Sequence, residues 1–271
     1  MPELPEIETL VRQLRESVLK KSFEDVRVHR ASVIDRTGWA LRTAVCGRDI
    51  RSVRRAGKYL ALELEDRGLL WFHMGMSGQL ILAARLPGAL SHVHLEFLFK
   101  GGGLLYYRDP RRFGRVFYQA PAAASPSALR FLGPDPFQVS AGEFAGVYQG
   151  RKARIKSLLL DQRLVSGLGN IYADESLFRA GIDPRKRASH IHQERLKALH
   201  ARVCETLKEA VSRGGSTIGD YRHVNGASGR FQDLHRVYGR EKQPCRSCAA
   251  GVRRVVISGR SSYFCPVCQK D

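Results

Sequence analysis

Four cysteines near the C-terminus constrain the fold of this chain more than any other feature of its sequence. They form two pairs, Cys245-x2-Cys248 and Cys265-x2-Cys268, with 16 residues between the pairs. Two cysteines on one tight turn can point at the same ion, and two such turns supply the four thiolates that tetrahedral zinc prefers. Because no additional acid, histidine or open coordination position accompanies them, we predict one structural zinc ion rather than a catalytic one.

The alternative interpretation of the four cysteines is a pair of disulfides, which requires an oxidising compartment. The first residues, MPELPE, are acidic and lack the apolar core of a secretory signal, so we expect a cytoplasmic protein. Cys46 and Cys204 are then expected to be small buried apolar side chains. The sequence contains no run of about 18 apolar residues, so we predict no membrane span.

The charge of the chain indicates a polyanionic partner. Lysine and arginine number 45 against 26 acidic residues, which gives a net charge of +19 and a pI near 10.2. A surplus of this size is typical of nucleic-acid binding. A membrane surface is the other option, but the basic residues are spread over many segments and form no basic amphipathic helix. Arg253, Arg254 and Arg260 lie between the cysteine pairs, where they can contact phosphates.

Hydrophobic periodicity divides the chain into a β-rich first half and a helical second half. A helix is predicted over 5–21. Short alternating or apolar segments bounded by Gly, Pro and Asp then predict a β-sandwich or barrel, with strands at 23–30, 49–55, 58–65, 69–73, 78–84, 92–99, 104–108 and 114–119. Helices are predicted over 142–148, 152–162, 171–180 and 189–212, with Gly181 as a stop signal. The Gly-rich segment 213–243 is predicted to be a long flexible loop.

Pro2 allows two interpretations. It is an ordinary first-turn proline, or it is a nucleophile once Met1 is removed. A free α-amine titrates near 7.7–8.0, about 2.5 units below lysine, so far more of it is neutral at pH 7. A secondary amine that attacks C1′ of a sugar gives an iminium, and this electron sink favours elimination at C2′. Glu3 lies next to it and can transfer protons.

Seven segments together resemble the bacterial formamidopyrimidine-DNA glycosylase family, in the same order along the chain. They are MPELPEIE, RRAGKYL, HMGMSGQL, DPRRFG, LLDQRLVSGLGNIYADESLFRAGI, VYGREKQPC and GRSSYFCPVCQ. Together they extend from residue 2 to the last cysteine pair. The related endonuclease VIII branch typically has glycine where this chain has Leu4, which favours the 8-oxoguanine branch.

The resemblance implies four catalytic residues. Pro2 is the expected Schiff-base nucleophile, Glu3 the proton donor in base release and Lys58 the proton donor in β-elimination. Arg260 is associated with δ-elimination and with a phosphate contact. We expect the phosphate contact, because a guanidinium does not lose its proton in proteins.

The resemblance also implies residues that contact double-stranded DNA. The wedge that fills the gap left by a flipped nucleotide is expected to be Met74, Arg111 and Phe113, on exposed loop tips. Core packing is the alternative for Met74 and Phe113. Lys156 and Asn170, in a helix–two-turn–helix motif, are expected to bind phosphate. His92 and Arg151 are expected DNA contacts, although HVHLEF departs from the family's HDHVDL and lysine is common at position 151. His73 is expected to make a local hydrogen bond.

The expected fold class is α+β, with a helix and a two-sheet β-sandwich followed by a helical domain and a four-cysteine zinc hairpin. We expect an N-terminal catalytic domain at 1–135, a linker at 136–150, a helix–two-turn–helix domain at 151–240 and a zinc finger at 241–271. The loop 214–229 is expected to cover the lesion, with Thr217, Ile218 and Tyr221 as candidate base contacts. A monomer acting on nucleoid DNA, in the cleft between the two domains, suits this organisation.

The expected activity is that of a bifunctional DNA glycosylase and AP lyase for oxidised purines. Three alternatives remain open. An endonuclease VIII-like enzyme would act on oxidised pyrimidines. A non-catalytic protein would bind DNA damage through the zinc hairpin and the helical motif, without need of a free amine. A zinc-hairpin protein for RNA is the third alternative.

Overall fold

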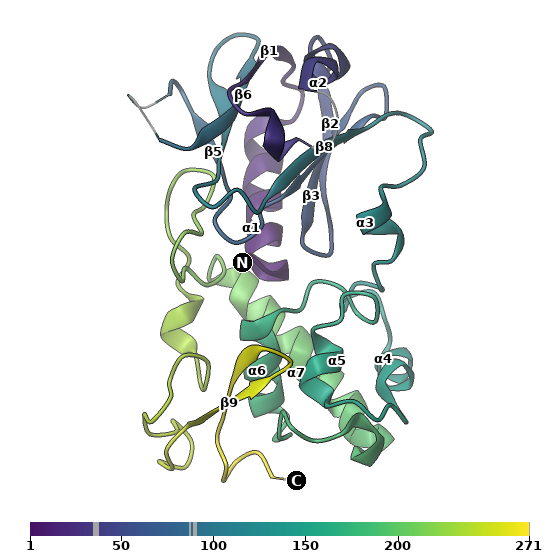
Figure 1. Cartoon of the computed structure of the whole chain (residues 1–271), viewed down its shortest axis with the longest axis vertical. Helices are drawn as coiled ribbons and strands as arrows, with labels where there is room; N and C mark the ends of the chain where they lie inside the picture. Colours follow the sequence, from purple (N-terminus) through teal and green to yellow (C-terminus); the bar gives the residue numbers. More distant parts are fainter. Residues whose placement is uncertain (35–37, 87, 89–90, 271) are drawn as a thin grey trace. The chain divides into compact units, whose positions relative to one another are not determined.

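The computed structural model describes residues 1–34, 38–86, 88 and 91–270. Residue 271 of the expected zinc finger and residues 35–37, 87, 89 and 90 of the expected N-terminal domain lie outside this description. The chain forms two compact units. Unit 1 comprises Met1–Arg130 and Arg213–Arg230, and unit 2 comprises Phe131–Ser212 and Phe231–Asp271. The first part of the Gly-rich segment, Arg213–Arg230, therefore belongs to the N-terminal unit (Figure 1).

Unit 1 begins with helix α1, Leu4–Val18. Its buried residues, which include Ile7, Leu10 and Leu14, recur at helical spacing and face the core. The helix ends three residues before the predicted end at 21. Lys20 adopts a left-handed φ of 64°, and its N–H donates to the carbonyl of Ile50, which ties the chain to the next strand rather than to a further helical turn.

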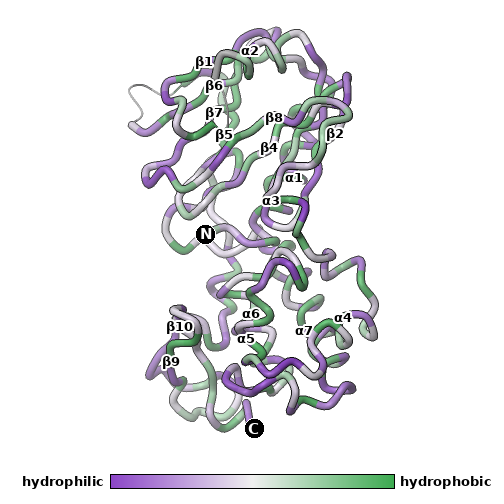
Figure 2. The backbone as a smooth tube through the Cα atoms, turned by 45° about the vertical axis from the view of Figure 1, so that its right-hand side comes forward, coloured by the Kyte–Doolittle hydropathy of each residue, from purple (hydrophilic) through white to green (hydrophobic). Residues whose placement is uncertain are grey.

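Two four-stranded antiparallel sheets follow, as the strand pattern predicts. One has the order β1-β6-β7-β5 and the other β2-β3-β4-β8. The strands are β1 Phe23–Val28, β2 Ile50–Ala56, β3 Tyr59–Leu64, β4 Leu69–His73, β5 Gln79–Ala83, β6 Val93–Phe99, β7 Leu104–Arg108 and β8 Arg115–Gln119. Their inner faces share one hydrophobic core with α1, in which the rings of Phe72 and Phe97 lie 5.8 Å apart. Helix α2, Gly38–Val45, was not predicted. Figure 2 shows hydrophobic residues gathered in the strands and hydrophilic ones along the connecting loops.

Unit 2 is mostly helical. Its helices are α4 Ala141–Tyr148, α5 Ile155–Leu159, α6 Asn170–Arg179 and α7 Gln193–Ser212. Helix α7 begins later than predicted because Ala188–His190 forms a separate 3-10 turn. Gly181 ends α6 with a φ of 64°, as expected for a glycine stop signal. A short helix α3, Ser127–Arg130, lies at the end of unit 1.

The C-terminal hairpin consists of β9, Arg253–Ile257, and β10, Arg260–Phe264. Ile257 pairs with Arg260, so the turn contains only Ser258 and Gly259. Both have positive φ, 50° and 74°, as a tight two-residue hairpin turn requires. This geometry places Arg260 directly after the turn.

The prediction of a flexible loop over 213–243 is wrong for much of that segment. Tyr221 and Val224 lie in the core of unit 1, and the N–H of Leu82 on β5 donates to the carbonyl of Val224. Further along, Phe231–Leu234 forms a 3-10 turn. Among the residues that the structure describes, no helix is long and apolar enough to cross a membrane.

Candidate functional site

The chain terminus, Glu3 and Lys58 form one cluster of chemical groups in unit 1. Pro2 and Glu3 are buried at the start of α1, and the N–H of Glu3 donates to Glu6 Oε2 at 2.8 Å. Lys58 is largely buried in the turn between β2 and β3. Burial lowers the pKa of the terminal ammonium, here on Met1, while Glu3 and Glu6 raise it and Lys58 and Arg111 lower it. Glu3 and Lys58 are therefore near enough to act on the terminus, so three of the four predicted catalytic residues belong to one cluster.

Arg55 connects the Lys58 turn to α1. Its Nε lies 3.1 Å from Glu8 Oε2, and its Nη1 donates to the carbonyl of Gly57 at 3.2 Å. Gly57 has a φ of 54°, a conformation that glycine adopts easily. Helix and turn are therefore held in one arrangement, with Lys58 beside the start of α1.

His73 ends β4 and lies beside Lys58. Its ring centroid is 4.7 Å from that of Tyr59. Burial first, and then the cations Lys58 and Arg115, lower the pKa of His73 to about 4. The imidazole is therefore neutral at pH 7.

His73 is expected to make the stability of unit 1 depend on pH between 6.5 and about 4. In this window the unfolded chain binds a proton that the folded chain does not, so the free energy of unfolding falls as the pH falls. Above pH 6.5 His73 is neutral in both the folded and the unfolded chain, so no stability is lost to its protonation. His73→Gln removes this pH dependence, so the stability difference between wild type and variant should change by up to about 3 kcal/mol across the window. Urea unfolding at pH 7 and 4.5, followed by tryptophan fluorescence, measures this; identical pH slopes for the two proteins would contradict it.

The expected position of Met74 on an exposed loop tip is wrong. Met74 is 1% exposed and packs in the core of unit 1. It continues the inward alternation of Leu70 and Phe72 on β4, and this period of two already favoured the core. Met76, two residues on, is 43% exposed and was missed. The flanking Gly75 and Gly78 were the signal that could have identified it as the tip of the turn.

Arg111 and Phe113 are exposed, as expected, on the loop between β7 and β8. Phe113 is 57% exposed, and the guanidinium of Arg111 lies 6.0 Å from its ring. Arg111 also lies 3.8 Å from the carboxylate of Asp220. His92 is exposed at the start of the neighbouring β6, with a positive φ of 68°.

The segment Arg213–Arg230 packs against α1. Glu6 Oε1 accepts the N–H of Ser216 at 2.7 Å, and the Tyr221 hydroxyl donates to the carbonyl of Glu6 at 3.2 Å. Tyr221 is buried, so its side chain offers no exposed surface for reading a base in this structure. The Thr217 hydroxyl accepts the N–H of Gly229. Ile218, by contrast, is exposed and remains a candidate base contact.

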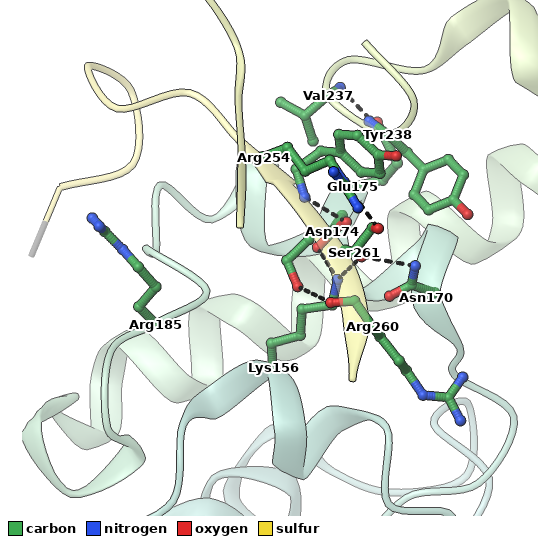
Figure 3. Close-up of polar contacts among 12 residues, drawn as sticks. Lys156, Asn170, Asp174, Glu175, Arg185, Val237, Tyr238, Arg254, Arg260 and Ser261 are labelled. Carbon is green, nitrogen blue, oxygen red and sulfur yellow. Dashed lines mark hydrogen bonds and ion pairs between the residues drawn. The ribbon is translucent and has the colours of Figure 1, made fainter. Parts of the chain in front are cut away.

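In unit 2, Lys156 is not an exposed phosphate ligand, and that expectation is wrong. Its side chain is fully buried, with Nζ 2.7 Å from Asp174 Oδ1 and 3.1 Å from the Ser261 carbonyl (Figure 3). Burial raises the pKa of Asp174 to about 7, against the opposing effect of Lys156. Asp174 Oδ2 also accepts the N–H of Tyr263. This pair joins α5 and α6 to the hairpin.

Asn170 and Arg260 both lie at the beginning of strand β10. Asn170 begins α6, and its Nδ2 donates to the Ser261 carbonyl at 2.9 Å. Arg260 is exposed, and its guanidinium extends away from the buried Lys156–Asp174 pair (Figure 3). Arg151 is also exposed, with Nε donating to the carbonyl of Val147. The hairpin thus presents Arg260 on a rigid support.

Glu175 is a structural residue that the sequence did not identify. Its carboxylate accepts the backbone N–H groups of Arg236, Val237 and Tyr238 at 2.8–2.9 Å (Figure 3). A buried carboxylate with three such donors fixes the approach to the cysteine module. Tyr238 in turn lies 5.2 Å from Tyr263 of β10, measured between ring centroids.

The four cysteines are arranged as one metal site. The sulfur atoms of Cys245, Cys248, Cys265 and Cys268 all lie within 4.8 Å of one another. Four thiolates at this separation fit the tetrahedral coordination of zinc and leave no position for a substrate. The cysteine module therefore holds one structural zinc ion, as predicted.

Three protein-family models match successive parts of the chain. The model of the formamidopyrimidine-DNA glycosylase N-terminal domain matches residues 1–116, and that of the H2TH domain matches 132–222. The model of a zinc finger found in FPG and IleRS matches 242–270.

Individual relatives match over their full length. The formamidopyrimidine-DNA glycosylase of Solibacter usitatus is 43% identical over 274 residues, covering 100% of both chains. The Lactococcus lactis Fpg, solved as a complex with DNA containing an abasic site, is 32% identical with a TM-score of 0.92, over 99% of this chain and 100% of that one. The MutM (Fpg) protein of Thermus thermophilus is 39% identical with a TM-score of 0.87, over 99% of this chain and 98% of that one.

Proposed function

The chain belongs to the formamidopyrimidine-DNA glycosylase family, and we propose on that premise that it excises oxidised purines from DNA and then cleaves the strand. It is a bifunctional DNA glycosylase and AP lyase of base excision repair. The observation that carries this proposal is the gathering of the chain terminus, Glu3 and Lys58 within unit 1. An amine, a carboxyl and an ammonium around one sugar supply a nucleophile and two groups that transfer protons.

The first reaction is release of the base. With Met1 removed, the lone pair of the Pro2 nitrogen attacks C1′, and the bond from C1′ to the damaged base breaks. Glu3 delivers the proton that the departing base takes up. The proton on the Pro2 nitrogen then passes to O4′ as the bond from C1′ to O4′ breaks, which opens the sugar and leaves the iminium. Burial lowers the pKa of the terminal ammonium on Met1, and we expect the same effect on the buried Pro2 nitrogen once it becomes the terminus, which favours the neutral amine that this attack requires.

The second reaction is strand cleavage. The iminium carbon withdraws electrons from C2′, so loss of a C2′ proton breaks the bond from C3′ to its phosphate oxygen. Lys58 serves as the proton donor in this β-elimination. A second elimination breaks the bond from C5′ to its phosphate oxygen, with Arg260 binding the phosphate. The product is a one-nucleotide gap with a phosphate at each end.

The DNA contacts are proposed to come from both units. Asn170, Arg151 and His92 contact the backbone, and Arg111 bonds the base opposite the lesion. Met76 and Phe113 are the apolar wedge, with Met76 in place of Met74. The structural zinc holds the hairpin that carries Arg260, and takes no part in the chemical steps.

We assign the parts of the chain accordingly. The catalytic sandwich occupies 1–135, a linker 136–150 and the helix–two-turn–helix region 151–240. Within that last range the segment 214–229 packs with unit 1, and it covers the lesion. The finger occupies 241–271. The enzyme acts as a monomer on DNA in the cytoplasm.

Base release from defined duplexes tests the proposed activity. We expect release from 8-oxoguanine opposite cytosine at least about 10-fold faster than from thymine glycol, since recognition of different hydrogen-bonding groups supports discrimination of that order or more. Single-turnover measurements with both duplexes at saturating enzyme provide the comparison, and undamaged duplex is the control. A preference for thymine glycol would assign the chain to oxidised pyrimidines instead. Binding of an abasic-site analogue without release of either base would indicate a damage-binding protein.

A further inference from the structure

Two short loops in unit 1 present the three exposed wedge residues. The turn 74–78 carries Met76, and the loop 109–114 carries Arg111 and Phe113. We refer to these two segments as the paired loops. These three side chains are exposed rather than packed in the core, so their positions depend on how the two backbones are held together.

Asp109 lies at the centre of the paired loops. It is 0% exposed, and its carboxylate is surrounded by donors. Oδ1 accepts the Ser77 hydroxyl, and Oδ2 accepts the N–H of Gly114 at 2.8 Å and the Tyr107 hydroxyl at 3.2 Å. One carboxylate therefore connects the turn, the end of the loop and strand β7.

Ser77 extends this network to Arg111. Its oxygen accepts the N–H of Arg111 at 3.1 Å while its hydroxyl donates to Asp109. The backbone of Asp109 is itself fixed, because its N–H donates to the carbonyl of His92 and its carbonyl contacts the ring of His94 at 2.8 Å. Two hydrogen bonds in succession, through the Ser77 hydroxyl, thus connect the main chain at Arg111 to the buried Asp109 carboxylate.

Two glycines bring the loop backbones into direct contact. A Cβ on Gly75 would lie 2.5 Å from the backbone nitrogen of Gly114, and a Cβ on Gly114 would lie 1.9 Å from the Tyr107 hydroxyl. Neither loop can shift towards the other without a clash. The hydrogen bonds of Asp109 prevent the opposite movement, so the two segments form one rigid support.

We propose that Asp109 is a positioning residue, whose buried carboxylate sets the placement of Met76, Arg111 and Phe113 and thereby the discrimination of the base opposite the lesion. The inference deepens the proposed function and rests on it. A side chain that fills a gap in a base stack loses its effect when displaced by about 1 Å, as misplaced groups in catalytic sites do. Asp109 acts only through the paired loops and touches no reacting atom.

Asp109→Asn is the first test. With the NH2 group in place of Oδ2, the N–H of Gly114 loses its acceptor, and with it in place of Oδ1 the Ser77 hydroxyl can accept from the amide but loses its own acceptor. In either orientation at least one buried donor is left without its acceptor. We expect base release from 8-oxoguanine opposite cytosine to slow by about 10-fold, the size expected for one charge-assisted bond. The preference for cytosine over adenine opposite the lesion should fall with it. Cleavage of a single-stranded abasic site, which needs no wedge, should stay within about 2-fold of wild type.

Two further variants separate positioning from general destabilisation. Val26→Ala removes two methyl groups from buried β1, away from the paired loops, and serves as the control of similar stability loss. Ser77→Ala removes the bridge from Asp109 to Arg111 and should reproduce the loss of preference for cytosine opposite the lesion. It provides the test if Asp109→Asn does not fold. The duplex Kd is expected to change less than the rate of release.

Equal effects of Asp109→Asn and Val26→Ala at matched thermal stability would overturn the inference, as would unaltered opposite-base preference in both loop variants. Failure of the proposed function would give a different result, which is seen in the wild-type protein. In that case the wild-type protein itself would neither release the base nor cleave single-stranded abasic DNA.

Discussion

Blocking the amine of Pro2 is expected to reduce both base release and strand cleavage by about 1,000-fold or more, the scale on which loss of a nucleophile acts. Retaining Met1 converts the proline nitrogen into an amide, whose lone pair is delocalised and cannot attack C1′. The rest of the protein should be unaffected, because Met1 is 44% exposed and lies outside α1. Affinity for a duplex with a tetrahydrofuran abasic analogue should therefore change little.

The experiment compares one preparation before and after removal of Met1 by methionine aminopeptidase. Mass spectrometry gives the trimmed fraction, and the rate of cleavage should rise in proportion to it. A variant in which Ser17, on α1, is changed to alanine serves as a control, and should respond to trimming like the wild type. Equal activity of the untrimmed and trimmed protein would exclude Pro2 as the nucleophile.

Removing the zinc is expected to weaken binding to abasic-analogue duplex by about 100-fold while unit 1 stays folded. The metal closes a hairpin that has little core of its own, and the energy of such sites is folding energy. Without it, Arg260 loses its position, because the Ser261 carbonyl that Lys156 and Asn170 contact belongs to the same hairpin. Loss of several phosphate contacts accounts for a reduction of that order.

Cys265→Ala provides the measurement, with Cys46→Ser as the matched control outside the site. A colorimetric chelator gives the zinc content, and fluorescence anisotropy gives the Kd. Both tryptophans, Trp39 and Trp71, belong to unit 1, so an unchanged emission maximum reports that this unit is intact. Zinc-free protein that binds as tightly as the control would refute a role of the hairpin in DNA binding.

Local patterns were sufficient to predict most of the fold. The eight strands of unit 1 were predicted to within two residues, because alternating side chains and turn residues mark them independently of distant contacts. The four cysteines gave the metal site for the same reason. Helix ends were less accurate, since the stop after Val18 depends on a hydrogen bond from Lys20 to Ile50.

The errors concern residues whose environment comes from distant parts of the chain. Lys156 resembles a solvent-exposed lysine in sequence, and only the fold brings Asp174 and the Ser261 carbonyl to its ammonium. The segment around Tyr221 has the composition of a flexible loop, and its order comes from contacts with α1. The wrong choice of Met74 instead of Met76 has a different cause, because the alternation of β4 already indicated that Met74 points into the core.

Covalent catalysis by the chain terminus passes through a Schiff base, which borohydride can trap. The trimmed, zinc-loaded protein is mixed with a duplex that carries 8-oxoguanine opposite cytosine, and borohydride reduces any Schiff base to a stable amine. Peptide mapping then locates the cross-link. We expect a cross-link at Pro2. A cross-link at Lys58 or another lysine, or none from protein that still binds the duplex, would contradict it.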